Sequence, residues 1–305
     1  MLVGQLAAAE LDRRLAGDGL AVRTGPVAFR LRSELPAVRD FVALAYADHP
    51  VLGDDDFCDH PVELNRVRGL RRWVRPQVRV RHDHQPIFEP MPLGHETPLL
   101  EWALNWCVSA HAHQYVVIHA AAIERQGRAV ILPAPPGSGK STLCAALVHR
   151  GWRLLSDELA LLSLDGGALH GLARPVSLKN QSIDIIQRFE PSASFSRRTH
   201  DTAKGTVALM KPLADHVRRV DEPARAAWLV FPRWEAGAPP RFTPRARPAA
   251  LMALSRNIFN FGITGRAGYR RLVETLDGCT CFDFRYGELD EAVQAFEALS
   301  QLPAP

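Results

Sequence analysis

Along residues 115–164, apolar runs typical of strands and a hydrophobic pattern typical of a helix follow one another in a regular order. The apolar runs at residues 115–123 and 129–132 are short and rich in valine, isoleucine and alanine, and we predict that both are strands. Residues 141–150 have the length and pattern of a helix, and the apolar run at residues 152–164 predicts a third strand. The turn residues Asp165, Gly166 and Gly167 follow this strand, and they predict that the chain folds back beside it as in a hairpin. This order of elements is typical of an α/β fold.

The first 90 residues show a different pattern and contain no catalytic signature. Short strand-like runs alternate with one amphipathic helix, at residues 19–32, 35–47, 61–65 and 77–82. A proline-rich segment at residues 85–94 marks a boundary. We therefore predict a small α+β domain at residues 1–92, used for partner recognition or oligomer contact, and a larger domain at residues 93–305.

The larger domain continues as mixed α/β structure on both sides of the segment described first. We predict a helix at residues 97–113, a strand at 227–231, helices near 249–259 and 266–276, and a final strand and helix. Residues 236–248, which are rich in proline and arginine, predict a loop.

A glycine-rich run after the strand at residues 129–132 has the features of a phosphate-binding loop: Ala134, Pro135, Pro136, Gly137, Ser138, Gly139, Lys140, Ser141 and Thr142. Backbone N–H groups of such a loop and the following helix N-terminus attract phosphate. We therefore expect ATP and Mg²⁺ as cofactors, with Lys140 at the phosphates and the Ser141 hydroxyl on the metal ion. Ala134 stands where the usual pattern has glycine, which requires an ordinary negative φ there.

The acidic pair Asp157 and Glu158 follows the loop after only one helix and one turn. This spacing predicts a carboxylate beside the γ-phosphate, where phosphoryl transfer requires charge neutralisation and a base. A solvated strand end is the structural alternative for the pair. His119, on the strand before the loop, is equally compatible with a site residue and with a core histidine.

These motifs together resemble the HPr kinase/phosphorylase family. The resemblance rests on His119 with Ala120, on the loop, and on residues 149–158, which run from the helix end to the acidic pair. Residues 173–180 and 204–208 are similar to segments of the HPr-kinase-related bacterial kinases called kinase A. The resemblance implies a P-loop kinase core of the HPr kinase and phosphoenolpyruvate carboxykinase type, and transfer of a phosphoryl group from ATP to a serine hydroxyl.

The resemblance also implies roles for individual residues. Asp157 would accept the hydroxyl proton, Glu158 would hold Mg²⁺ with Ser141, Lys140 would bind the phosphates, and His119 would face the γ-phosphate. Glutamate replaces the second aspartate of the family motif, so the roles of Asp157 and Glu158 are open to exchange. The family's E-x-R-G segment is absent, so we do not expect the reverse reaction on HPr.

The acceptor implied by the kinase A likeness is a dedicated protein or peptide, associated with a small PqqD-like binding protein. Only four lysines occur among the 37 basic residues, so a retained lysine can mark a site that needs a compact ammonium. Candidates for substrate binding are Arg174, Lys179 and Lys204, each of which is also compatible with an ordinary surface charge. Two alternatives remain: a nucleotide-sensing module without phosphoryl transfer, and a kinase for a small alcohol metabolite.

Composition narrows the class of protein further. The net charge of +4 contains no block of like charge, which argues against a nucleic-acid partner. No apolar run approaches the length of a membrane span, and the N-terminus has no export signal, so we expect a cytoplasmic bacterial protein without a membrane partner. Five scattered cysteines argue against a disulfide framework or a zinc site. Homo-oligomerisation is expected only because relatives of the HPr kinase type assemble.

Overall fold

The computed structural model describes residues 1–53 and 55–302, and the chain divides into two compact units. The first unit contains Met1–Val108, Leu172–Asp184 and Ala193–Arg219. The second contains Ser109–Gly171, Ile185–Ser192 and the described residues from Val220 onward. The predicted boundary at residue 92 therefore falls inside the first unit, and the role assigned to residues 1–92 stays a prediction.

The main sheet of the first unit has six strands, in the order β1-β2-β3-β4-β5 with β6 paired to β4. Their bounds are Leu20–Thr24, Val27–Arg32, His60–Arg66, Gln77–His82, Gln85–Pro86 and Met91–Pro92. Short 3-10 helices at Val3–Gln5 and Gly69–Arg72 accompany α1 (Ala8–Ala16), α2 (Pro36–Ala45) and α3 (Glu96–His111). Every second residue at the start of β3 is buried, which gives the sheet one core face.

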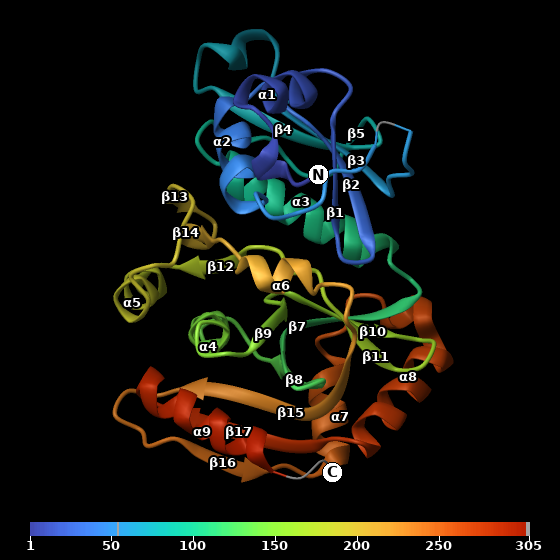
Figure 1. The fold of residues 1–305 in the computed structure, drawn as a ribbon, viewed down its shortest axis with the longest axis vertical. Helices are drawn as coiled ribbons and strands as arrows, with labels where there is room; N and C mark the ends of the chain where they lie inside the picture. The colour runs from blue at the N-terminus through green and yellow to red at the C-terminus, as the bar shows by residue number, and fades with distance from the viewer. Residues whose placement is uncertain (54, 303–305) are drawn as a thin grey trace. The chain divides into compact units, whose positions relative to one another are not determined.

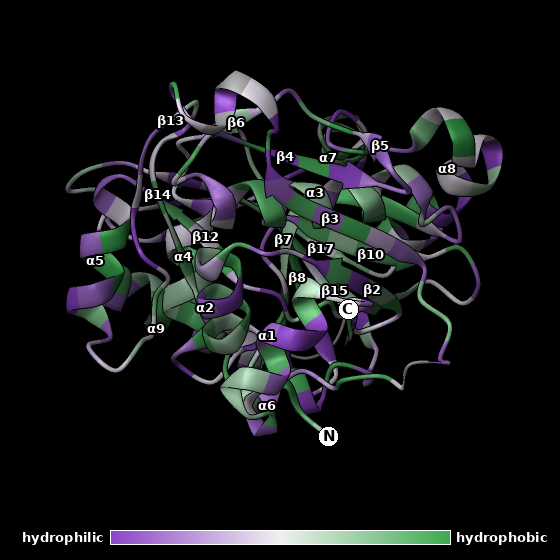
Figure 2. Ribbon diagram, turned by 90° about the horizontal axis from the view of Figure 1, so that it is seen from above, coloured by the Kyte–Doolittle hydropathy of each residue, from purple (hydrophilic) through white to green (hydrophobic). Residues whose placement is uncertain are grey.

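The first unit also holds a small antiparallel sheet in the order β12-β14-β13 (Figure 1). These strands are β12 (Val176–Lys179), β13 (Thr199–Thr202) and β14 (Gly205–Met210). Helix α6 (Ala214–Arg218) follows them, and α5 (Gln181–Phe189) crosses from the first unit's segment into the second's. Hydrophobic and hydrophilic bands alternate along α5 in Figure 2, as expected of an amphipathic helix.

The second unit is built on an eight-stranded sheet in the order β11-β10-β7-β8-β15-β17-β16, with β9 also paired to β7. The strands are β7 (Tyr115–Arg125), β8 (Arg128–Pro133), β9 (Arg153–Ser156), β10 (Leu159–Ser163), β11 (Ala168–His170), β15 (Ala224–Trp234), β16 (Arg241–Pro244) and β17 (Thr280–Tyr286). Strands β8, β15 and β17 are mutually parallel, and their other neighbours are antiparallel. Their carboxyl ends therefore meet at one edge of the sheet.

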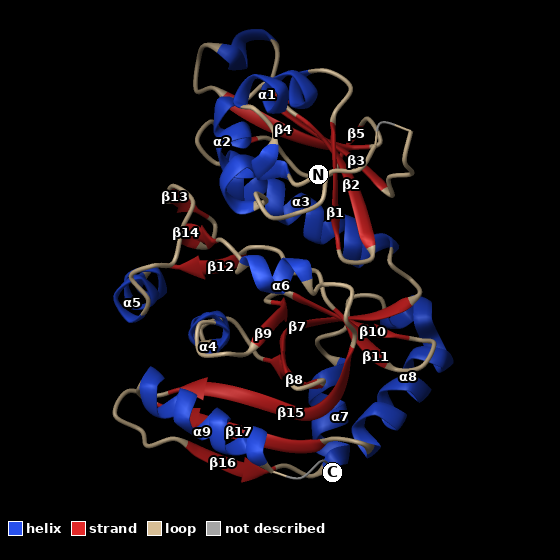
Figure 3. Ribbon diagram, in the orientation of Figure 1, coloured by secondary structure: helices blue, strands red, loops and turns tan. Residues whose placement is uncertain are grey.

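Helices cover both faces of this sheet (Figure 3). They are α4 (Lys140–Val148), α7 (Arg247–Ser255), α8 (Phe261–Asp277) and α9 (Leu289–Gln301). Trp228 of β15 packs against Trp152, and Trp152 packs against Phe296 of α9. The next residue of β15, Leu229, belongs to the core cluster that includes residues of α7 and α8. Because consecutive strand residues point to opposite faces, α9 lies on one face and α7 with α8 on the other.

The fold is thus mixed α/β with several sheets, and the kinase core stays a prediction. The hairpin-like return after residue 164 is confirmed by the antiparallel pairing of β10 with β11. The single strand predicted at residues 152–164 is wrong, because Asp157 and Glu158 separate β9 from β10. The run at residues 19–32 is a hairpin of two strands, and the predicted loop at 236–248 contains β16 and the start of α7.

Candidate active site

The predicted phosphate-binding loop lies at the edge where the parallel strands of the second unit end. Strand β8 ends at Pro133, residues 134–139 cross to α4, and the helix begins at Lys140. Trp234 and Tyr286 are the last residues of β15 and β17, and they face each other in the parallel register. The loop therefore stands beside two aromatic residues from strands far away in the sequence.

Backbone carbonyls of the loop point toward these two residues. The backbone N–H of Trp234 donates to the Ser138 carbonyl at 2.9 Å, and the Tyr286 hydroxyl donates to the Gly139 carbonyl at 3.1 Å. In a trans peptide the next N–H points opposite to the carbonyl. The N–H groups of Gly139 and Lys140 are consequently turned away from the strands, next to the N-terminus of α4, which is the arrangement that binds an anion.

Both glycines of the loop have a positive φ, but the space around them differs. A Cβ on Gly139, with φ 85°, would lie 2.4 Å from the Tyr286 hydroxyl and 3.0 Å from Trp234 Cβ. A Cβ on Gly137, with φ 84°, would meet no atom within 4 Å. Ala134 is not among the residues with positive φ, so its ordinary backbone is confirmed. Close packing therefore excludes a side chain at Gly139, and backbone conformation alone disfavours one at Gly137.

Lys140, Glu158 and His119 form a charged cluster beside the loop. The Lys140 ammonium donates to the Asp157 carbonyl at 2.6 Å and lies 3.8 Å from Glu158 Oε2. His119 Nε2 donates to the same glutamate oxygen at 3.0 Å. The topology explains the grouping, because β7 pairs with β8 along one edge and with β9 and β10 along the other. The acidic pair thus faces the strand that carries His119.

The two carboxylates differ in their exposure. Asp157 is only 3% exposed, whereas the side chain of Glu158 is 18% and that of His119 is 34% exposed. Burial raises the pKa of the Cys144 thiol well above its usual value, the negative charge of Asp157 raises it further, and Lys140 lowers it. Asp157 therefore lies toward the buried side of α4, and Glu158 lies toward the accessible side with His119.

One loop atom has the character of a ligand-binding group. The Ser138 hydroxyl oxygen is buried and has no hydrogen-bond partner among the residues that the structure describes. A buried hydroxyl in this state costs free energy that a ligand oxygen or a bound water can recover. Together with the N–H groups of Gly139 and Lys140, it fits the requirements of a phosphate group.

Sequence reasoning missed the residues that hold the His119 strand in place. The backbone N–H of His119 donates to the Asn257 carbonyl at 2.6 Å, and the Asn260 side chain bonds the backbone of Val117 and Tyr115. The Phe259 ring lies 5.4 Å from the His119 ring. Nothing in the local sequence of residues 257–260 signals this contact, because it depends on non-local packing.

The substrate-binding candidates Arg174, Lys179 and Lys204 belong to the first unit, and the charged cluster belongs to the second. Arg174 is buried, bonds Asn105 and lies 3.9 Å from Glu101. The exposed Lys204 ammonium lies 5.2 Å from the centre of the Trp102 ring. The backbone N–H of Lys179 donates to the Ser182 hydroxyl at 2.9 Å. The structure therefore brings the predicted catalytic residues together within the second unit, and each of these three residues has its own contacts in the first unit.

Comparison with known proteins gives limited support for a family. The family described as "SynChlorMet cassette protein ScmC" matches residues 99–175, which hold most of α3, the glycine loop and the acidic pair. This is 77 of 305 residues and a different family from the HPr-kinase-related kinases that the motifs resemble, so membership of either family is not established. No curated protein sequence matches the chain.

Among solved structures, the chain has a likeness to the Hpr(Ser) kinase/phosphatase from Coxiella burnetii. The identity is 12% and the TM-score is 0.25, over 60% of this chain and 97% of the other. A TM-score this low does not establish a shared fold. Within residues 1–53 and 55–302, no helix is long and apolar enough to cross a membrane.

Proposed function

We propose that this protein is an ATP-dependent kinase that transfers a phosphoryl group to a serine hydroxyl of a protein or peptide. The observation that carries the proposal is the charged cluster of Lys140, Glu158 and His119 beside a loop whose N–H groups face away from their supporting strands. ATP bound to Mg²⁺ suits such a site, because the ammonium attracts the phosphates and the two nearby carboxylates attract the metal ion.

The loop and Lys140 would bind the phosphates. ATP supplies the phosphoryl group, and Mg²⁺ neutralises the charge on its β and γ oxygens. The N–H groups of Gly139 and Lys140 and the Ser138 hydroxyl are arranged to donate to phosphate oxygens. The Lys140 ammonium lies beside the Asp157 carbonyl and Glu158 at the start of α4, and its flexible side chain would turn from these groups to a phosphate.

The acidic pair would divide the metal and base roles. We assign proton acceptance from the serine hydroxyl to Asp157, and Mg²⁺ binding to Glu158 with Ser141. The alternative exchanges the two roles, with Glu158 as the base and Asp157 on the metal ion. The deeper burial of Asp157 and the bond between Glu158 and His119 favour this alternative. In either assignment one carboxylate binds the metal ion and the other accepts a proton.

The acceptor would be a macromolecule that the first unit helps to bind. Lys204, exposed beside Trp102, supplies a positive charge on an aromatic surface, and Lys179 is proposed with it. Arg174 is buried against Asn105 and Glu101, so we do not propose that it touches the acceptor directly. A small PqqD-like binding protein is the partner that we propose for presenting the peptide. Mass spectrometry of proteins that co-purify with the Asp157→Asn variant would name the acceptor.

Paired carboxylate variants test the proposal. Asp157→Asn and Glu158→Gln are compared with Asp165→Asn, a matched change at an exposed turn residue. Binding of Mg²⁺–ATP is measured by calorimetry, and transfer is measured as label from γ-labelled ATP on serine. We expect the base variant to keep ATP binding within about threefold and to lose transfer by about 100-fold or more, because an amide cannot accept a proton. If both variants still transferred label like Asp165→Asn, the proposal would be wrong, and ATP binding without any transfer by the unaltered protein would favour a nucleotide-sensing module.

A further inference from the structure

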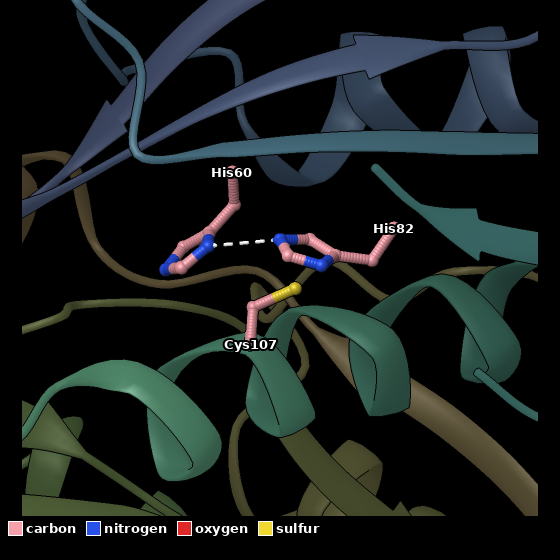
Figure 4. A group of neighbouring side chains, drawn as sticks. All are labelled: His60, His82 and Cys107. Carbon is pink, nitrogen blue, oxygen red and sulfur yellow. Dashed lines mark hydrogen bonds between the residues drawn. The ribbon is translucent and has the colours of Figure 1, made fainter. Parts of the chain in front are cut away.

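Two histidines and a cysteine meet on the core side of the six-stranded sheet in the first unit. His60 begins β3, His82 ends β4, and Cys107 lies on α3 (Figure 4). One ligand atom from each residue lies within 4.8 Å of the other two. Figure 4 shows the cysteine sulfur directed from the helix toward the imidazole pair.

The strand register puts both histidines on the same face. His82 pairs directly with Val62, and His60 is two residues before Val62, so the two imidazoles are diagonal neighbours. Every second residue of β3 from His60 is buried, and this buried face is the one covered by α3. The cluster therefore follows from regular sheet geometry and the placement of one helix.

The distances suit a tetrahedral metal ion. His60 Nδ1 and His82 Nε2 are 3.1 Å apart. Two imidazole nitrogens on one tetrahedral zinc ion stand roughly 3.3 Å apart, given Zn–N bonds of about 2.0–2.1 Å. A thiolate on the same ion stands roughly 3.6 Å from each nitrogen, given a Zn–S bond of about 2.3 Å. The nitrogens are thus already near ligand spacing, and the sulfur, which lies within 4.8 Å of each nitrogen, needs a shift of no more than roughly 1.2 Å.

The surroundings resemble the apolar shell of a metal site. Cys107 is fully buried and His60 is 7% exposed. The Phe29 ring lies 5.7 Å from His60, and the Trp106 ring lies 5.5 Å from His82. Such a shell restricts solvent and strengthens the attraction between a cation and a thiolate.

We propose that His60, His82 and Cys107 bind one zinc ion, with a water molecule at the fourth position. Imidazole and thiolate together select a soft-to-borderline ion over magnesium or calcium, which require oxygen ligands. Binding releases the thiol proton to solvent, and the imidazole that carries the proton between the two rings holds it instead on its other nitrogen, so both histidines bind as neutral ligands. The ion would join α3 to β3 and β4. This proposal is independent of the kinase function.

Zinc binding by the full-length protein tests this site. After dialysis against zinc, elemental analysis should give one zinc per chain, and the thermal unfolding midpoint should rise with zinc concentration. Cobalt substitution should give a sulfur-to-metal charge-transfer absorption. Cys107→Ser should abolish that absorption, and Cys107→Ser and His82→Gln should each weaken zinc binding by about 100-fold or more.

Cys58→Ser is the matched control, because Cys58 is the cysteine that is not buried and is the thiol most open to adventitious metal. It should leave zinc stoichiometry and the cobalt spectrum unchanged, and so should Lys140→Ala. Less than stoichiometric zinc in the unaltered protein would overturn the proposal. Loss of binding in Cys58→Ser with retention in Cys107→Ser would overturn it as well. The zinc content of the unaltered protein tests the proposal by itself, so the test still holds if a variant fails to fold.

Discussion

The charged cluster of the second unit and the histidine–cysteine cluster of the first differ in charge and in exposure. Lys140 and Glu158 carry opposite charges, and the neighbouring His119 side chain is 34% exposed. The first unit's cluster is formed by two imidazoles and a thiol, and its cysteine is fully buried. A charged, accessible cluster suits a ligand that enters and leaves in each cycle. A largely buried cluster of nitrogen and sulfur ligands suits an ion that stays with the fold.

The largest expected effect is that of Lys140→Ala on phosphoryl transfer. Removing the ammonium takes away the main protein cation in the cluster, and we expect transfer from ATP to fall by about 100-fold or more. Lys211→Ala is the control, since it removes a lysine that pairs with Asp48 in the first unit. Transfer is measured with γ-labelled ATP. Equal transfer by the two variants would show that the charged cluster is not the site of phosphoryl transfer.

The two loop glycines should separate close packing from backbone strain. We expect Gly139→Ala to destabilise the protein by about 2–4 kcal/mol and to abolish ATP binding, because its Cβ collides with Tyr286 and Trp234. Gly137→Ala should cost only about 1 kcal/mol, since its Cβ meets open space. Denaturation midpoints and calorimetric ATP binding measure both effects, and a larger loss in Gly137→Ala would contradict the described loop support.

Burial of an uncharged histidine in the first unit should make stability depend on pH. Burial lowers the pKa of His49 to about 4. The unfolded chain binds this proton below about pH 6.5, whereas the folded chain binds it only near pH 4, so stability is lost as pH falls through this window. The full effect is about 3 kcal/mol.

The His49 contribution is isolated by comparison with His49→Phe, which keeps a ring beside Tyr46. Glu101 has a pKa raised by burial and titrates with the opposite sign, so only the difference between the proteins is informative. The stability of the unaltered protein should fall more steeply from pH 6.5 to pH 4 than that of the variant. His84→Gln, at an exposed histidine, should follow the unaltered protein, and parallel curves for all three would refute the assignment.

The loop could be predicted from the sequence because its glycines, lysine and hydroxyl are consecutive in the chain. Its position between a strand and a helix follows from the apolar runs on either side. Trp234 and Tyr286 could not be predicted as its support, because that contact requires knowing that β15 and β17 run parallel to β8. The break at Asp157 was missed since the apolar pattern continues on both sides of the acidic pair.

The cluster of His60, His82 and Cys107 could not be predicted from spacing. Its members come from two strands and a helix, at separations that match no metal-binding motif. All five cysteines are free in the structure. Their scattering along the chain predicts no zinc site. That prediction rests on the cysteines alone, whereas the site proposed above also uses two histidines on a shared sheet face.

The most direct test of the proposed transfer to serine labels the γ-phosphate and the α-phosphate of ATP in separate experiments. The purified protein is incubated with an extract of its source cells and with either γ-labelled or α-labelled ATP, and acid-stable label on serine is measured. We predict label on serine from γ-labelled ATP only, and its loss when Asp157→Asn and Glu158→Gln are combined. Label that persists in this double variant, or a protein that binds Mg²⁺–ATP yet never labels serine, would contradict the proposed kinase.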